Sequence, residues 1–72
     1  MNEAIIKEAL EGEFPGATID VQLDGSHCHV MVISDAFEGL RPVARQQRVY
    51  APLGEFIRSG ALHAVNIIAK TP

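Results

Sequence analysis

Four side chains of this chain carry donors that bind transition metals, namely His27, Cys28, His29 and His63. Imidazole suits iron, zinc and copper, and thiolate suits zinc and iron–sulfur clusters. No Cys-x-x-Cys or His-Glu-x-x-His spacing is present, so the sequence predicts no self-contained zinc site. One or two of these histidines could instead complete a site whose thiolates come from another molecule.

The adjacent positions of His27, Cys28 and His29 limit which of them act together. On a strand successive side chains point to opposite faces, so His27 and His29 share one face and Cys28 faces the other. We interpret Cys28 as a small core residue and His29 as an exposed side chain. The sequence also lacks a Gly-x-Ser-x-Gly motif and an enclosed acidic pair, and Cys28 points away from its neighbouring histidines. These observations predict that the chain is not an enzyme.

A second candidate site is the group Arg41, Arg45 and Arg48, which recur at helical spacing. Arginine contacts phosphates and base edges, so this group is the strongest indication of nucleic-acid binding in the sequence. The alternative is a solvated helix face that pairs with acidic neighbours or with a protein partner. No Gly-x-x-Gly loop accompanies the arginines, and an acidic chain repels phosphate backbones on average.

Length and composition bound the remaining possibilities. The 72 residues predict one domain, residues 1–72, and the 47% of hydrophobic residues are enough for a packed core. A single cysteine excludes an intramolecular disulfide, and the formal net charge is −3. No apolar run approaches the roughly 20 residues of a membrane span, and no basic segment opens a secretory signal. We therefore expect a cytoplasmic protein that is monomeric in isolation and does not contact membranes.

The apolar pattern predicts an α+β fold in the order helix, strand, strand, helix, strand. Residues 2–14 form an amphipathic helix that Pro15-Gly16 ends, and residues 19–23 alternate as a half-buried strand up to a turn at Asp24-Gly25. Residues 27–34 are almost continuously apolar, which predicts a central strand buried on both faces.

The second half of the chain supplies one helix and the last strand. Residues 41–58 read as helical, and we expect a kink or break near Tyr50-Ala51 because Pro52 removes a hydrogen bond. Residues 65–68 form the last strand. The apolar positions expected to face the core from this helix are Val43, Val49, Leu53, Phe56 and Ile57.

The connection between the second and third strands carries a helix, which favours parallel neighbouring strands in a three-stranded mixed sheet. The starting ends of parallel neighbours lie side by side. His27 stands at the start of one strand and His63 just before the other. The topology therefore predicts that these two histidines meet at one end of the sheet.

Motifs along the whole chain resemble the BolA-like family, and more closely its IbaG-type bacterial branch. Each motif is weak alone, but the Phe-x-Gly, Arg-x-x-Val-Tyr and final His…Thr-Pro segments together are specific. The matching stretches are Asp24-Gly25-Ser26-His27, Val30-Met31-Val32-Ile33-Ser34-Asp35-Ala36-Phe37-Glu38-Gly39, Arg45-Gln46-Gln47-Arg48-Val49-Tyr50, Ala51-Pro52-Leu53, and His63-Ala64 through Lys70-Thr71-Pro72.

The resemblance implies a compact α+β fold similar to class II KH domains. It also implies a partner, a monothiol glutaredoxin, and a bridging two-iron two-sulfur cluster to which glutaredoxin and glutathione supply thiolates. In such a complex His63 matches the family's histidine ligand, and His27 matches the hairpin ligand of histidine-type members. Cys28 stands where the family often has an aromatic residue, and no role transfers to it or to His29. Some relatives are described as acid-stress or DNA-binding regulators, a role that Arg41, Arg45 and Arg48 would carry here.

Overall fold

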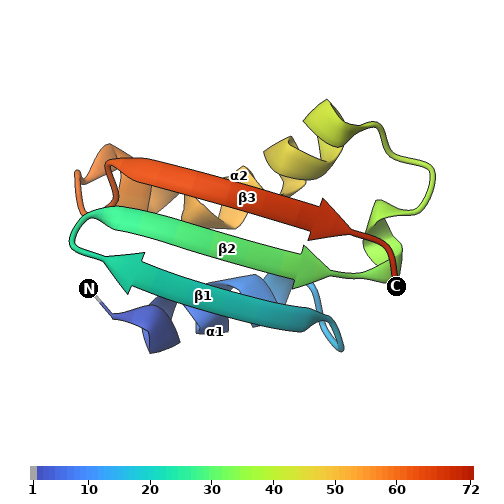
Figure 1. Cartoon of the computed structure of the whole chain (residues 1–72), viewed down its shortest axis with the longest axis horizontal. Helices are drawn as coiled ribbons and strands as arrows, with labels where there is room; N and C mark the ends of the chain where they lie inside the picture. Colours follow the sequence, from blue (N-terminus) through green and yellow to red (C-terminus); the bar gives the residue numbers. More distant parts are fainter. Residues whose placement is uncertain (1) are drawn as a thin grey trace.

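The computed structural model describes residues 2–72 and has the predicted order of elements (Figure 1). The three strands form one sheet, and a short 3-10 helix, η1, follows the second strand. In chain order the elements are α1 (Glu3–Glu13), β1 (Thr18–Asp24), β2 (His27–Ile33), η1 (Asp35–Phe37), α2 (Pro42–Arg58) and β3 (Ala64–Lys70). Neither helix in residues 2–72 is long and apolar enough to cross a membrane.

The sheet has the order β1-β2-β3, so β2 is central as predicted. β1 and β2 pair antiparallel from Asp24↔His27 to Thr18↔Ile33, and β2 and β3 pair parallel from His27↔Ala64 onward. The hairpin turn is Gly25-Ser26, one position later than the Asp24-Gly25 signal, because Asp24 still pairs with His27. Gly25 has φ +62°, and within residues 2–72 only glycines have a positive φ, so φ of Ser26 is negative. A positive φ at the first turn residue and a negative φ at the second match a type II′ turn.

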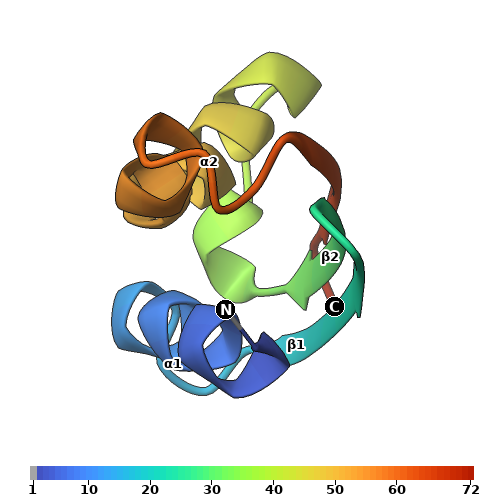
Figure 2. The same cartoon turned by 90° about the vertical axis from the view of Figure 1, so that its left-hand side faces the viewer.

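Both helices cover the same face of the sheet and leave the other face open (Figure 2). Cys28, Val30 and Val32 of β2 point into the covered face and are buried. On the open face His27 and His29 are exposed, and Met31 and Ile33 are only half-buried. The prediction that β2 is buried on both faces is therefore wrong, because no element of the described chain packs on the second face. The buried hydrophobic core consists of Ile6, Leu10, Phe14, Ile19, Val21, Cys28, Val30, Val32, Phe37, Val49, Leu53 and Leu62.

Helix α2 runs from Pro42 to Arg58 without the break expected near Pro52. Val49 and Leu53, on either side of Pro52 in sequence, are both fully buried, and this packing offsets the loss of one backbone hydrogen bond. Val43 is 69% exposed and Ile57 is 37% exposed, so the expected place of these two residues in the core is wrong. At 100° per residue Val43 lies about 120° around the helix from Val49 and cannot share its face.

Helix α1 begins at an Asn2 cap, whose Oδ1 accepts a hydrogen bond from the Ile5 amide at 3.0 Å. Its first residue, Glu3, also reaches the sheet, because its Oε2 accepts a hydrogen bond from the Leu23 amide at 2.9 Å. The carboxylate thus occupies a donor on the outer edge of β1. Ile6 and Leu10 form the buried face of this helix, and Phe14, its C-cap residue, is buried beside them.

Candidate functional site

The backbone brings His27 and His63 together at the end of the sheet where β2 and β3 start. His27 pairs with Ala64, the residue after His63, and the His63 amide donates a hydrogen bond to the Ser26 carbonyl at 3.0 Å. Since that carbonyl directly precedes His27, standard bond lengths place the two Cα atoms within about 7 Å of each other. The predicted meeting of the two residues at one end of the sheet is confirmed at the level of the backbone.

Both side chains are accessible to a partner. His27 and His63 are exposed, and among the described histidines only His29 forms a side-chain hydrogen bond. Two uncommitted imidazoles on neighbouring strands have the donor chemistry that iron, zinc or copper accepts. No group of three or more metal-binding side chains occurs within residues 2–72. The arrangement therefore fits a metal centre only when another molecule provides the remaining ligands.

The two neighbours of His27 on β2 belong to other environments. Cys28 is fully buried on the helix-covered face, where burial and, to a smaller extent, the charge of Glu3 raise the pKa of its thiol. It faces away from His27, and its interpretation as a core residue is confirmed. His29 lies on the open face, and its Nδ1 stands 3.1 Å from the side-chain nitrogen of Asn66 on β3. When the amide nitrogen donates, the neutral ring carries its proton on Nε2.

The three arginines do not form one free stripe. Arg41 precedes α2 and is exposed, with no side-chain hydrogen bond at the helix start. The Arg45 Nε donates to the Leu40 carbonyl at 2.8 Å. Arg48 is further engaged and is the one of the three that pairs with an acidic neighbour, Glu13, as the alternative interpretation expected.

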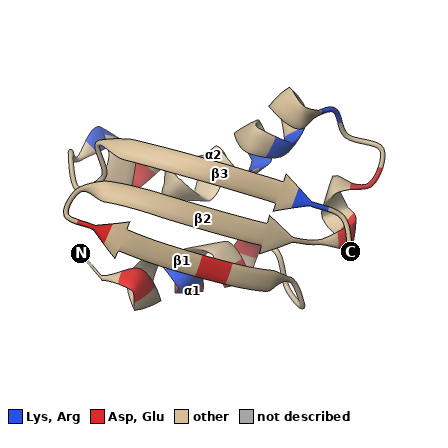
Figure 3. Cartoon of the chain, viewed as in Figure 1, with Lys and Arg blue, Asp and Glu red and all other residues tan. Residues whose placement is uncertain are grey.

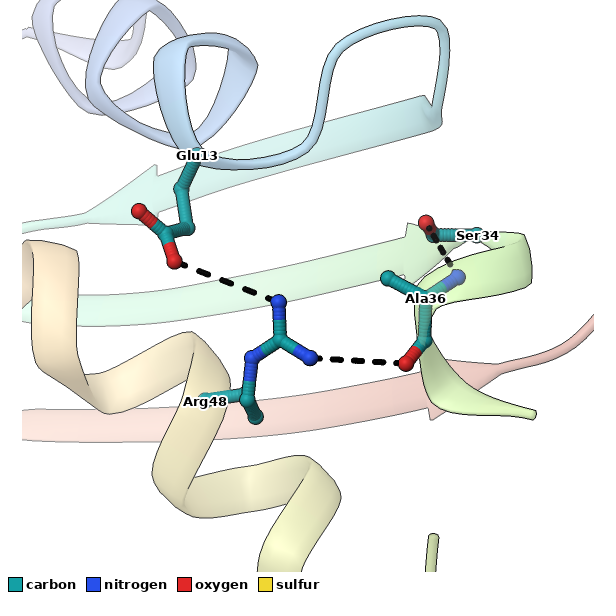
Figure 4. Close-up of polar contacts among 4 residues, drawn as sticks. All are labelled: Glu13, Ser34, Ala36 and Arg48. Carbon is teal, nitrogen blue, oxygen red and sulfur yellow. Dashed lines mark hydrogen bonds and ion pairs between the residues drawn. The ribbon is translucent and has the colours of Figure 1, made fainter. Parts of the chain in front are cut away.

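Arg48 connects three segments that are distant in sequence (Figure 4). Its guanidinium lies 4.0 Å from a carboxylate oxygen of Glu13, donates to the Ala36 carbonyl at 3.4 Å and stands 5.4 Å from the centre of the Phe14 ring. We call this group the Arg48 clamp. Sequence reasoning missed it because no local pattern links the end of α1, η1 and the middle of α2.

Comparison with known proteins places this geometry in a family. The family model for BolA-like proteins matches residues 4–72. A protein from the rpoN-murA intergenic region of Acinetobacter guillouiae is 44% identical over 71 residues, which is 99% of this chain and 86% of the relative. The acid stress protein IbaG of Escherichia coli K12 is 44% identical over 54 residues, which is 75% of this chain and 64% of IbaG.

Solved structures agree with this assignment. BolA1 from Arabidopsis thaliana has a TM-score of 0.86 at 32% identity, covering 96% of this chain and 89% of that one. The BolA domain of SufE1 from the same plant has a TM-score of 0.86 at 34% identity, covering 100% of this chain and 95% of that one. From its sequence and its fold, this chain belongs to the BolA-like family.

Proposed function

We propose that this chain is a non-enzymatic adaptor that binds a monothiol glutaredoxin and shares a bridging two-iron two-sulfur cluster with it, in iron–sulfur trafficking or in iron or stress regulation. The observation that carries the proposal is the placement of His27 and His63. Two exposed histidines with no internal side-chain partner lie side by side in the backbone, at the starts of adjacent parallel strands. Together they offer two of the ligands that such a cluster requires.

The chain's own contribution is to hold two imidazole nitrogen donors at one end of the sheet. The hydrogen bond from the His63 amide to the Ser26 carbonyl ties the segment before β3 to the hairpin that carries His27. Thiolates of glutaredoxin and glutathione would complete the centre. Its iron would act as the Lewis acid that accepts the nitrogen lone pairs of both imidazoles. Protonated imidazole cannot bind a metal, so we expect complex formation to weaken as the pH falls.

Co-expression with a monothiol glutaredoxin tests this proposal. We expect a coloured heterocomplex whose visible absorption and circular dichroism change when His63→Ala or His27→Ala replaces an imidazole. His29→Ala is the matched control, because it removes an exposed imidazole of the same strand that has no proposed ligand role. Spectra that are identical for His63→Ala and the unmodified chain would show that His63 is not a ligand. Absence of any coloured complex would contradict the whole proposal.

Nucleic-acid regulation through Arg41, Arg45 and Arg48 stays a prediction, and no structural observation favours it over the adaptor role. Substituting Arg45 and Arg48 together would also remove their internal contacts. Arg41→Glu is the cleaner variant because its side chain is exposed. Binding to duplex DNA at low salt that falls steeply with added salt and is lost in Arg41→Glu would support this role.

A further inference from the structure

The outer edge of β3 is a row of unpaired backbone groups. Lys70 faces β2, since its carbonyl accepts a hydrogen bond from the Ser34 amide at 2.9 Å. Backbone groups alternate along a strand, so those of Val65, Ile67 and Ala69 point away from β2. The Val65 carbonyl accepts a 3.4 Å hydrogen bond from the Tyr50 hydroxyl. Within residues 2–72 the outward groups of Ile67 and Ala69 have no hydrogen-bond partner.

The opposite edge of the sheet, on β1, is partly protected, so the two edges differ in how readily they would pair with another strand. On β1 the Leu23 amide is occupied by the Glu3 carboxylate, and Asp20 and Asp24 place negative charge along the strand. Charged residues and covering side chains are the usual means by which proteins prevent unwanted strand pairing. β3 carries one charged residue, Lys70, at its last position. Its edge is therefore competent for pairing with another extended segment.

A row of exposed apolar side chains on α2 runs beside this edge. Val43, Tyr50 and Ile57 are spaced by seven residues, two helical turns, and are 69%, 38% and 37% exposed. We call these three residues the α2 stripe. The hydrogen bond from Tyr50 to Val65 places the stripe on the β3 side of the helix. At 1.5 Å per residue the stripe is about 21 Å long, which exceeds the roughly 16 Å spanned by five residues of a strand.

Apolar exposure is concentrated around the same edge. Five large hydrophobic side chains are exposed among the described residues, and four of them are the α2 stripe and Ile68. Ile68 is 52% exposed and lies on the open face of β3. An added strand would therefore meet apolar surface on both of its faces, at the stripe on one side and at Ile68 on the other.

Charge is segregated between the two sides of the molecule. Eight of the nine acidic residues and one of the six basic residues lie in residues 1–40, a formal net charge of −7. Residues 41–72 hold five basic residues and one acidic residue, a net charge of +4. Figure 3 shows most of the acidic positions on α1, β1 and η1, whereas most of the basic ones lie on or next to α2 and at the end of β3. The open edge thus belongs to the positively charged side.

We propose that the edge of β3 binds an extended, acidic peptide segment of a partner protein, which adds to the sheet as a fourth strand. The main-chain groups of Ile67 and Ala69 would pair with the peptide backbone. Alternate apolar side chains of the peptide would pack on the α2 stripe and on Ile68. An acidic residue at one end of the peptide would meet Lys70 at the last position of the strand. This site is separate from His27 and His63 and does not depend on the proposed function.

The same observations argue against the other occupants. Pairing of two β3 edges in a dimer would bring two positively charged sides together, a repulsive arrangement. A nucleic acid would pair with the cations, but it would not form strand hydrogen bonds with the unpaired backbone groups and would not bury the apolar side chains of the α2 stripe. An acidic extended peptide matches the backbone edge, the α2 stripe and the charge.

Selection from a phage-displayed library of random dodecapeptides against the immobilised chain tests the proposal. We expect enrichment of sequences with alternating apolar residues and an acidic residue at one end. A synthetic peptide of the enriched sequence should slow hydrogen exchange of the Ile67 and Ala69 amides. Ala69→Pro removes one outward amide and should weaken binding about tenfold. Ala69→Ser keeps that amide and should bind within about twofold.

Surface variants test the site even if Ala69→Pro does not fold. Val43→Asp places a carboxylate on an exposed position of the α2 stripe and should weaken binding about fivefold or more. Lys70→Glu should also weaken binding, most strongly at low salt, whereas Lys7→Glu makes the same charge change on the acidic side and should have little effect.

Four outcomes would overturn the proposal. They are failure to enrich any peptide, protection of amides away from β3, a dimer that Ala69→Pro converts to monomers, and an oligonucleotide that perturbs the β3 amides where the peptide does not.

Discussion

Arg48→Gln tests whether the Arg48 clamp stabilises the fold. The substitution removes an ion pair to Glu13, a cation–π contact with Phe14 and a long hydrogen bond to the Ala36 carbonyl. The two charged side chains are 40% and 47% exposed and 4.0 Å apart, so the pair contributes at most about 1 kcal/mol. The cation–π contact adds about 0.5–1 kcal/mol, and the hydrogen bond about 0.5 kcal/mol or less.

We therefore expect Arg48→Gln to lower the free energy of unfolding by about 1–2 kcal/mol, out of a total of roughly 4–11 kcal/mol for a domain of this size. The corresponding fall in Tm is about 5–15 °C. Urea and thermal unfolding followed by circular dichroism measure both quantities. Arg41→Gln is the matched control, since it removes the same charge from an exposed side chain and should change the free energy by less than about 0.5 kcal/mol.

Two comparisons show how much the Arg48 clamp contributes to the free energy of unfolding: a double-mutant cycle and the Arg41→Gln control. A double-mutant cycle with Glu13→Gln should give a coupling below about 1 kcal/mol that decreases in high salt, because the pair is partly exposed. If Arg48→Gln and Arg41→Gln unfold at the same urea concentration, the clamp does not stabilise the fold. Arg48 would then be free to serve a binding role on the surface.

Three further predictions concern the turn, the free thiol and the edge of β1. Gly25→Ala should destabilise the fold by about 1–2 kcal/mol because Gly25 has φ +62°, whereas Gly12→Ala, within α1, should stabilise it by about 0.5–1 kcal/mol; both are measured by urea unfolding. Cys28 should resist Ellman's reagent until the chain unfolds. The folded state keeps this thiol protonated to a higher pH than the unfolded chain does, because burial raises its pKa. The contribution of the thiol to the free energy of unfolding is therefore fully present below the ordinary pKa of 9.0 and is lost as the pH rises through the raised pKa. A free energy of unfolding that stays constant above pH 9 would contradict this prediction. Glu3→Ala should cost about 1–2 kcal/mol and speed hydrogen exchange at the Leu23 amide, and unchanged exchange there would exclude the edge contact.

The order of elements and the histidine pair could be predicted because both depend on local patterns. The 3.6-residue period marked α1, and the alternation at Ile19, Val21 and Leu23 marked β1. A helix-bearing connection favoured parallel strands, and with the two strands as neighbours this brings His27 and His63 to one end of the sheet. The opposite directions of Cys28 and His29 followed from strand geometry alone.

Errors arose where a local pattern was ambiguous. The apolar run of β2 is compatible with burial on one face or on both, and only the placement of the two helices decides between them (Figure 2). Val43 looked like a core residue because it is apolar and helical. Its angle from Val49 around α2 excludes it from the core, and it lies on the exposed stripe. Pro52 suggested a break that tertiary packing of the helix prevents.

Local residue patterns therefore specified the secondary structure, the strand directions and the two candidate ligands, since each depends on neighbours in sequence or on the connection between two strands. Tertiary packing decided which surfaces stay uncovered. It engaged Arg48 with Glu13 and Phe14, occupied the outward Leu23 amide of β1 with Glu3 and left the outward groups of Ile67 and Ala69 on β3 unpaired. These features depend on contacts between segments far apart in the chain, and such contacts exist only once the helices have packed on one face of the sheet.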